Sequence, residues 1–105
     1  MKEITVEELK ELKDSGDDFQ LIDVREPYEY DVSNLGGELI PLGNVPNSVE
    51  KIARDKKVVL YCRSGRRSAD AITWLERNHK FDNLYNLQGG ILEWVAEIDP
   101  DMDTY

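Results

Sequence analysis

Apolar and polar positions in the first quarter of the chain follow two different patterns. Leu9 and Leu12 are spaced as on one face of a helix, and the residues before them, Thr-Val-Glu-Glu at 5–8, have the form of a capping box. Gly16 is a suitable end for that helix. The next segment, residues 19–24, is a short apolar run that ends in charge, which is typical of a buried strand. The chain is therefore expected to begin with a helix that is followed by a strand.

The alternation of strands and helices continues along the chain. Residues 57–61 are β-branched and aromatic, and Ala71, Ile72 and Leu75 lie at helical spacing. This alternation indicates an α/β fold on a largely parallel sheet, in which ligands bind at the carboxyl ends of the strands. The further elements expected are the first turn of a helix at 27–30, a strand at 38–41, a helix within 46–55, a strand at 57–61, a helix from Arg66 or Arg67 to Asn78, a strand at 83–87 and a helix at 91–97.

Length, charge and cysteine content narrow the range of functions. The 105 residues fit one domain, 1–105, and the net charge of −9 argues against a nucleic-acid or anionic-membrane partner. A single cysteine allows no intramolecular disulfide, and with one histidine no zinc-finger type of cluster is expected. The first ten residues lack the apolar run of a signal peptide, and no segment approaches the ~18 apolar residues of a membrane span. The expected location is therefore the cytoplasm.

Cys62 is the candidate for chemistry, because it follows a buried strand and precedes a helix. The backbone N–H groups of such a loop, together with the positive end of the helix dipole, form a cradle for an anion. Arg63, Arg66 and Arg67 add positive charge within six residues of an otherwise acidic protein. Both effects favour a thiolate. An inert buried thiol and a solvated row of arginines are the simpler interpretations of the same residues.

Two small residues complete this loop. Gly65 allows the loop backbone to bend at a position where a side chain would be in the way, and Ser68 can form a hydrogen bond near the helix start. A thiolate in an anion cradle can attack phosphorus, or it can attack sulfane sulfur and hold the product as a persulfide. The residues alone leave both reactions open, because each substrate is a small oxyanion.

Three segments resemble, in the same order, the signatures of rhodanese-like domains. The resemblance is collinear from about Ile4 onwards, and three signatures in order are more specific than any one of them. One feature departs from the family pattern, since Asn34 stands where many members have His, which affects local packing rather than the chemistry. The segments are Cys-x-x-Gly-x-Arg-Ser at 62–68, residues 21–26 with Tyr-Glu-Tyr at 28–30, and Gly-Gly at 89–90 with Trp94.

The resemblance implies a fold and a reaction. The fold would be a central, mostly parallel five-stranded sheet with helices on both faces, and Cys62 would accept sulfur without any metal or organic cofactor. Backbone amides of the loop, residues 63–67, would hold the persulfide, while Asp23 and Arg25 would lie nearby and organise the loop. The substrate-binding residues expected from the resemblance are Arg63, Ser64, Gly65, Arg66, Arg67 and Ser68.

Function is open to three interpretations at this point. The first is a sulfurtransferase whose partner is a small sulfur-containing anion such as thiosulfate, or a sulfur-carrier or persulfide-bearing protein. Residues 37–43 resemble rhodanese domains appended to adenylating enzymes of sulfur-carrier pathways. The second is a docking or regulatory module without turnover.

The third interpretation is a cysteine phosphatase. The resemblance disfavours it, because phosphatase relatives have a loop one residue longer, with Arg at the sixth position after the cysteine. Here Arg67 is the fifth and Ser68 the sixth, and no general acid is evident. Arg67 is expected to brace the loop against an acidic partner, either Asp23 or Glu29.

Overall fold

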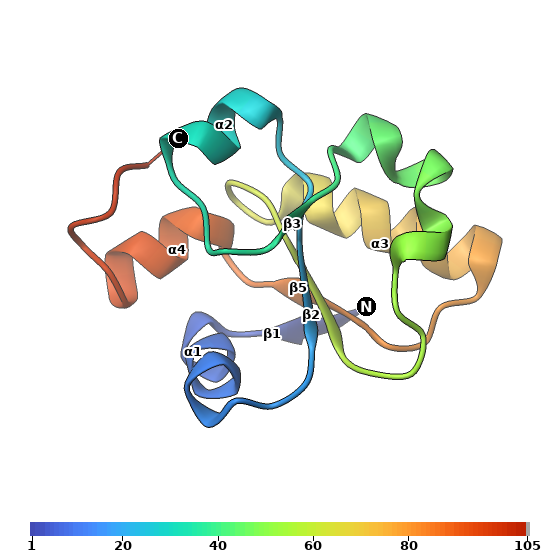
Figure 1. The fold of residues 1–105 in the computed structure, drawn as a ribbon, viewed down its shortest axis with the longest axis horizontal. Helices are drawn as coiled ribbons and strands as arrows, with labels where there is room; N and C mark the ends of the chain where they lie inside the picture. The colour runs from blue at the N-terminus through green and yellow to red at the C-terminus, as the bar shows by residue number, and fades with distance from the viewer. Residues whose placement is uncertain (105) are drawn as a thin grey trace.

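The computed structural model describes residues 1–104 and has one five-stranded sheet at its centre (Figure 1). The strand order is β1-β5-β4-β2-β3, and every pairing is parallel. The predicted α/β fold is therefore confirmed, with a sheet that is wholly parallel. The strands are β1 (Lys2–Ile4), β2 (Gln20–Asp23), β3 (Glu38–Leu39), β4 (Val58–Tyr61) and β5 (Leu84–Leu87).

Helices connect the strands and cover the sheet. The first of them begins with the predicted capping box, in which the Glu8 N–H donates to Thr5 Oγ1 at 3.1 Å and the Thr5 N–H donates to Glu8 Oε1 at 2.9 Å. This helix ends at Gly16, also as predicted. The helices are α1 (Val6–Ser15), α2 (Pro27–Val32), α3 (Arg66–His79) and α4 (Gly90–Glu97), together with two 3₁₀ helices, η1 (Leu42–Asn47) and η2 (Val49–Lys51).

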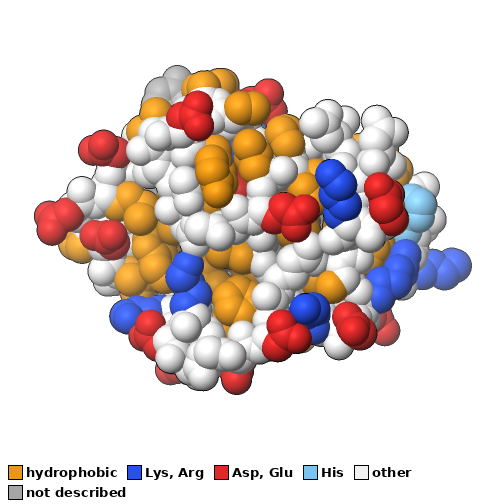
Figure 2. Space-filling model, in the orientation of Figure 1, with side chains coloured by type: hydrophobic (Ala, Val, Ile, Leu, Met, Phe, Trp, Pro, Cys, Tyr) orange, Lys and Arg blue, Asp and Glu red, His pale blue; other side chains and the backbone are white. Residues whose placement is uncertain are grey.

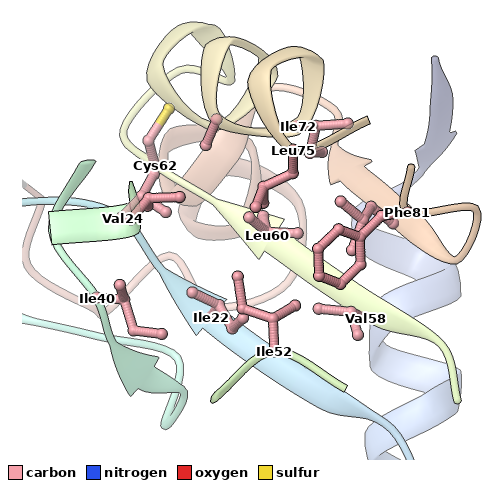
Figure 3. Packing of buried hydrophobic residues seen from close by; sticks show 13 residues of the cluster. Ile22, Val24, Ile40, Ile52, Val58, Leu60, Cys62, Ile72, Leu75 and Phe81 are labelled. Atoms are coloured by element: carbon pink, nitrogen blue, oxygen red, sulfur yellow. The ribbon is translucent and has the colours of Figure 1, made fainter. Parts of the chain in front are cut away.

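The core consists of two apolar clusters, one on each face of the sheet. Alternate residues of each strand point to opposite faces, so Val58 and Leu60 of β4 belong to one cluster while Val59 and Tyr61 belong to the other. The first cluster packs against α3 and the 3₁₀ segments, and the second against α1 and α4. Cys62 lies at the edge of the first cluster, as Figure 3 shows. The sheet therefore presents the cysteine at its carboxyl edge.

Two sequence predictions of local structure differ from the observed fold. The helix predicted within residues 46–55 is wrong, because this part of the chain forms η1 and η2 and then returns to β4 without regular structure. Pro46 lies inside η1, where it has no N–H to continue an α-helical ladder. Strand β1 was not predicted, since only Ile4 of its three residues is buried and no alternating pattern could develop.

Charged side chains are dispersed over the surface. On the face shown in Figure 2, acidic side chains are spread widely and Lys and Arg side chains lie between them. This agrees with a net charge of −9 that is not confined to one segment. Within residues 1–104, no helix combines the length and apolar character needed to cross a membrane.

Candidate active site

The loop after β4 folds around the sulfur of Cys62. Only residues 62–65 join β4 to α3, and Gly65 caps the helix with φ at 102°, a conformation that favours glycine. The Gly65 N–H donates to Cys62 Sγ at 3.1 Å. Ser68 lies close to the same sulfur, with its N–H and its Oγ both at 3.4 Å. The amino end of α3 therefore faces the sulfur with donors and with the positive end of its dipole.

Burial strengthens the effect of these donors on the sulfur. Cys62 is 1 % exposed, and its apolar neighbours in the cluster include Val24 of the segment after β2 (Figure 3). In such surroundings a negative charge on sulfur depends on N–H groups and not on water. Of the amides of residues 63–67 that were expected to form the cradle, the Gly65 N–H contacts the sulfur, and the second N–H in contact is that of Ser68, just beyond this range.

The beginning of α4 holds the same loop from its other side. The Ile91 N–H donates to the Cys62 carbonyl at 2.9 Å, and the Leu92 N–H donates to the Arg63 carbonyl at 3.1 Å. Gly90 makes this approach possible, since a Cβ on it would lie 2.5 Å from both carbonyl oxygens. The Gly-Gly signature thus has a physical role, which is to let the unpaired N–H groups of a helix end bind the loop carbonyls.

Arg67 braces the loop against α2 by pairing with Glu29, one of the two acidic partners that were predicted for it. Its Nη1 and Nη2 donate to the two carboxylate oxygens of Glu29 at 2.7 and 2.9 Å. Glu29 is 3 % exposed, whereas the side chain of Arg67 is 33 % exposed. The hydrogen bonds from Arg67 hold the pKa of Glu29 below its ordinary value of 4.5. The alternative pairing, with Asp23, does not form, because Asp23 binds Arg25.

Replacement of Arg67 is expected to destabilise the protein in a pH-dependent way. Arg67→Ala leaves the Glu29 carboxylate buried without its guanidinium, at a cost of about 2–3 kcal/mol, less than for a fully buried pair because Arg67 is partly exposed. The contribution of a carboxylate with a lowered pKa is present above its unfolded value and is lost as the pH falls through its folded value. The stability difference from wild type should therefore be large at neutral pH and small well below 4.5.

Urea unfolding at several pH values measures this difference. The matched control is Arg77→Ala, which removes an exposed arginine from the last turn of the same helix. A stability difference for Arg67→Ala that is the same at neutral and acid pH would contradict the assigned pairing with Glu29.

Asp23 and Arg25 form a buried pair at the end of β2. Both are 0 % exposed, and Arg25 donates to the Asp23 carboxylate through Nε at 3.0 and 3.1 Å and through Nη2 at 2.8 Å. The Arg25 backbone N–H donates to the same carboxylate at 2.9 Å, and Nη2 also reaches the Ser33 carbonyl at 2.6 Å. The pair therefore fixes the chain after β2, and its expected organising role in the loop stays a prediction.

The remaining candidates for substrate binding lie at the surface. Arg63, Ser64 and Arg66 are exposed, and within residues 1–104 their side chains form no hydrogen bond or ion pair. Their expected role in substrate binding stays a prediction, whereas Arg67 is engaged with Glu29. The structure separates the predicted loop residues into those that contact the sulfur, one that braces the loop and three that are exposed.

Asn86 is a site residue that sequence reasoning missed. It lies in β5, is 4 % exposed, and its side chain bonds both to Ser68 Oγ, at 2.6 Å, and to the Gly65 carbonyl, at 3.1 Å. A signal was available, because a carboxamide within a predicted buried strand needs partners. The sequence could not identify those partners, since they lie about twenty residues away in the chain.

Comparisons with known proteins agree with this geometry. The family model described as the rhodanese-like domain matches residues 5–97. A protein of Allochromatium vinosum named "Sulfurtransferase" is 34 % identical over 96 residues, which cover 90 % of this chain and 89 % of the relative. The structure of a rhodanese-like domain protein from Staphylococcus aureus superposes with a TM-score of 0.83 at 27 % identity and covers 100 % of this chain and 99 % of that one.

A longer relative matches as well. The Mycobacterium tuberculosis protein named "Probable adenylyltransferase/sulfurtransferase MoeZ" is 41 % identical over 105 residues, which cover 97 % of this chain but 26 % of that protein. The chain thus spans about a quarter of the length of this relative. With a family model over most of its length and a matching fold, the chain belongs to the rhodanese-like domain family.

Proposed function

We propose that this protein is a sulfurtransferase that carries sulfane sulfur on Cys62 as a persulfide. The observation behind the proposal is the cradle, in which the N–H groups of Gly65 and Ser68 and the amino end of α3 face one buried sulfur. Such an arrangement stabilises the thiolate that attacks and the anionic persulfide that results. Relatives named sulfurtransferases support the same assignment.

The proposed reaction has two displacement steps. In the first, the Cys62 thiolate attacks the outer sulfur of thiosulfate, so that a bond forms between Sγ and this sulfur while the sulfur–sulfur bond of thiosulfate breaks. The bonding electron pair leaves with sulfite. In the second, a thiophilic acceptor such as cyanide or a thiolate attacks the outer sulfur of the persulfide, and the Cys62 thiolate is regenerated. Each step forms one bond to the outer sulfur and breaks another, so neither step needs an external oxidant or reductant.

The position of the loop arginine favours sulfur transfer over phosphate hydrolysis. A phosphoryl group presents several charged oxygens, and its transfer relies on cationic side chains around them. Arg67 is committed to Glu29 by two hydrogen bonds, and the next residue, Ser68, offers the sulfur its backbone N–H instead. The cradle therefore offers donors for one anionic atom beside the cysteine, which suits a persulfide.

The donor class that we propose is a small sulfur-containing anion, with a persulfide-bearing or sulfur-carrier protein as an alternative partner. Arg63 and Arg66 are the exposed cations of the loop, on a protein whose net charge is −9. They supply local attraction for an anion at the surface over Cys62. Likeness to a relative named as both an adenylyltransferase and a sulfurtransferase supports the protein partner.

Replacement of either exposed arginine is expected to weaken donor binding more than turnover. Arg63→Ala and Arg66→Ala should each raise KM for thiosulfate with little change in kcat, the pattern of lost uniform binding. Because both side chains are exposed to water, we expect a loss in kcat/KM of about tenfold, equivalent to about 1.4 kcal/mol. Steady-state kinetics at low ionic strength measure it, and Arg77→Ala is the control. A fall in kcat at unchanged KM would assign these residues to the chemical step instead.

A turnover assay tests the proposed function. The wild type and Cys62→Ser are incubated with thiosulfate and cyanide, and thiocyanate is measured; a parallel reaction contains an aryl phosphate. The proposal expects thiocyanate from the wild type only and no phosphate release. Phosphate release without thiocyanate would assign a phosphatase, and a protein inactive in both reactions and with a persulfide donor in place of thiosulfate would be a docking module.

A further inference from the structure

The Cys62 loop is held from behind by one buried side chain of β5. Asn86 Nδ2 donates to the Gly65 carbonyl at 3.1 Å, and Asn86 Oδ1 accepts from Ser68 Oγ at 2.6 Å. Asn86 is 4 % exposed, and both polar ends of its carboxamide are used on the loop. Gly65 and Ser68 are also the two residues whose N–H groups contact Cys62 Sγ. The side chain therefore fixes the donors of the cradle without contacting the sulfur.

The chemistry of the groups determines their hydrogen bonds. A carbonyl can only accept, so the NH₂ of Asn86 faces Gly65 and the amide oxygen faces Ser68. The Ser68 hydroxyl has a single hydrogen, which it donates to Asn86 over the short 2.6 Å contact. In this arrangement the contacts that donate hydrogen to Cys62 Sγ are the two backbone N–H groups. The electrostatic stabilisation of charge on the sulfur thus depends on how the backbone is held.

We propose that Asn86 is a positioning residue of sulfur transfer, which holds the N–H groups of Gly65 and Ser68 toward Cys62 through hydrogen bonds to Gly65 and Ser68 themselves. The inference rests on the proposed function of Cys62. As the thiolate attacks the outer sulfur of thiosulfate and sulfite departs with the bonding electron pair, negative charge passes to the new terminal sulfur. Preorganised donors stabilise that charge only while the loop keeps its shape.

Loss of the Asn86 amide is expected to loosen the donor that lies nearest to the sulfur. The Gly65 N–H is at 3.1 Å, while the Ser68 N–H and Oγ are at 3.4 Å. Release of the Ser68 hydroxyl from Asn86 could give the sulfur a replacement donor, but at the longer distance. The weakened Gly65 contact therefore dominates, and the thiolate of Cys62 becomes less stable.

The charged groups around the sulfur stay in place when Asn86 is changed. Arg67 of α3 interacts electrostatically with Cys62, and Glu29 of α2 lies behind Arg67. The buried pair of Asp23 and Arg25 lies at the end of β2. An effect of Asn86→Ala on the sulfur therefore reports on the hydrogen-bonded loop and not on a changed charge.

Asn83 provides the matched control. It lies just before the other end of β5 and is half-buried. Its Nδ2 donates to two backbone carbonyls, those of Ala53 at 2.8 Å and Lys56 at 2.7 Å. Asn83→Ala and Asn83→Leu thus make the same chemical changes and remove comparable bonds, but far from Cys62 along the strand.

The experiment measures the rate of Cys62 alkylation by iodoacetamide against pH for the wild type and for Asn86→Ala, Asn86→Leu and the two Asn83 variants. Both Asn86 variants should shift the profile to higher pH by about one unit, a roughly tenfold loss of thiolate on the acid side. The Asn83 variants should lower the melting temperature and leave the profile unchanged. Asn86→Leu has nearly the same side-chain shape, carries no charge and removes both hydrogen bonds, so it serves if Asn86→Ala does not fold.

Kinetics give a second, independent readout. Asn86 does not reach the exposed side of the loop, so Asn86→Ala should lower kcat for thiosulfate about tenfold with KM little changed, the opposite of the pattern expected for Arg63 and Arg66. The proposal is overturned if the Asn86 alkylation profile superposes on that of the wild type, or if the Asn83 variants shift it equally. Alkylation needs no sulfur donor, so a wild type that does not accept sulfur would refute the proposed function separately.

Discussion

Gly90→Ala is expected to be among the most destabilising single substitutions in the chain, and to disturb the Cys62 loop directly. The new Cβ would lie 2.5 Å from the carbonyl oxygens of Cys62 and Arg63, which are backbone atoms and cannot rotate away. Gly90 also has φ at 62°, a left-handed conformation that costs a residue with a side chain about 1–2 kcal/mol. With about 1–3 kcal/mol for overpacking, the total is about 2–5 kcal/mol.

Gly16→Ala is the control that separates the two contributions. Gly16 has φ at 74°, but a Cβ there would meet nothing within 4 Å, so only the conformational cost of about 1–2 kcal/mol applies. Urea unfolding measures both variants, and thiosulfate turnover should fall only for Gly90→Ala. Equal stabilities of the two variants would show that α4 does not press on the loop as closely as the structure indicates.

Arg25→Leu is expected to cost about 3–5 kcal/mol, because it leaves the Asp23 carboxylate buried without its partner. Both residues are 0 % exposed, so water cannot replace the guanidinium. A domain of this size has a stability on the order of 5–15 kcal/mol, so the loss is a large share of the total. Unfolding by urea and by heat measures it, with expression in the cold where the variant is marginal.

The double variant Asp23→Leu/Arg25→Leu tests whether the two side chains act as a pair. Because it removes both charges together, it should be more stable than Arg25→Leu alone. Lys10→Ala is the surface control, since the Lys10–Asp14 pair is 50 % and 65 % exposed and should contribute about 0.3–0.5 kcal/mol. A double variant no more stable than the single one would contradict the coupling.

Local signals in the sequence predicted the parts of the fold that depend on neighbouring residues. The capping box of Thr5 and Glu8, the strand before Cys62 and the start of α3 at Arg66 each involve a few consecutive positions. The same holds for Gly65, whose bend is a requirement of the loop itself. The structure confirms these elements. Each could be predicted because it depends only on residues that are close together in the sequence.

Contacts between segments that are distant in the chain were harder to predict from the sequence. Arg67 could be paired with an acid by reasoning from charge, but two acids were available, and only the packing of α2 against the loop selects Glu29. Asn86 reaches the loop because β4 and β5 are neighbours in the sheet, with Leu60 paired to Asn86. That neighbourhood follows from the strand order, which the alternation of strands and helices does not determine.

The most direct test of Cys62 as a sulfur carrier is the intact mass of the protein after incubation with thiosulfate. The wild type should gain the mass of one sulfur atom per chain, and cyanide should remove it, because Cys62 is the only cysteine and lies in a cradle of N–H donors. Cys62→Ser should gain nothing. A wild type whose mass stays unchanged with thiosulfate and with persulfide donors, or a Cys62→Ser variant that gains the same mass, would contradict the account.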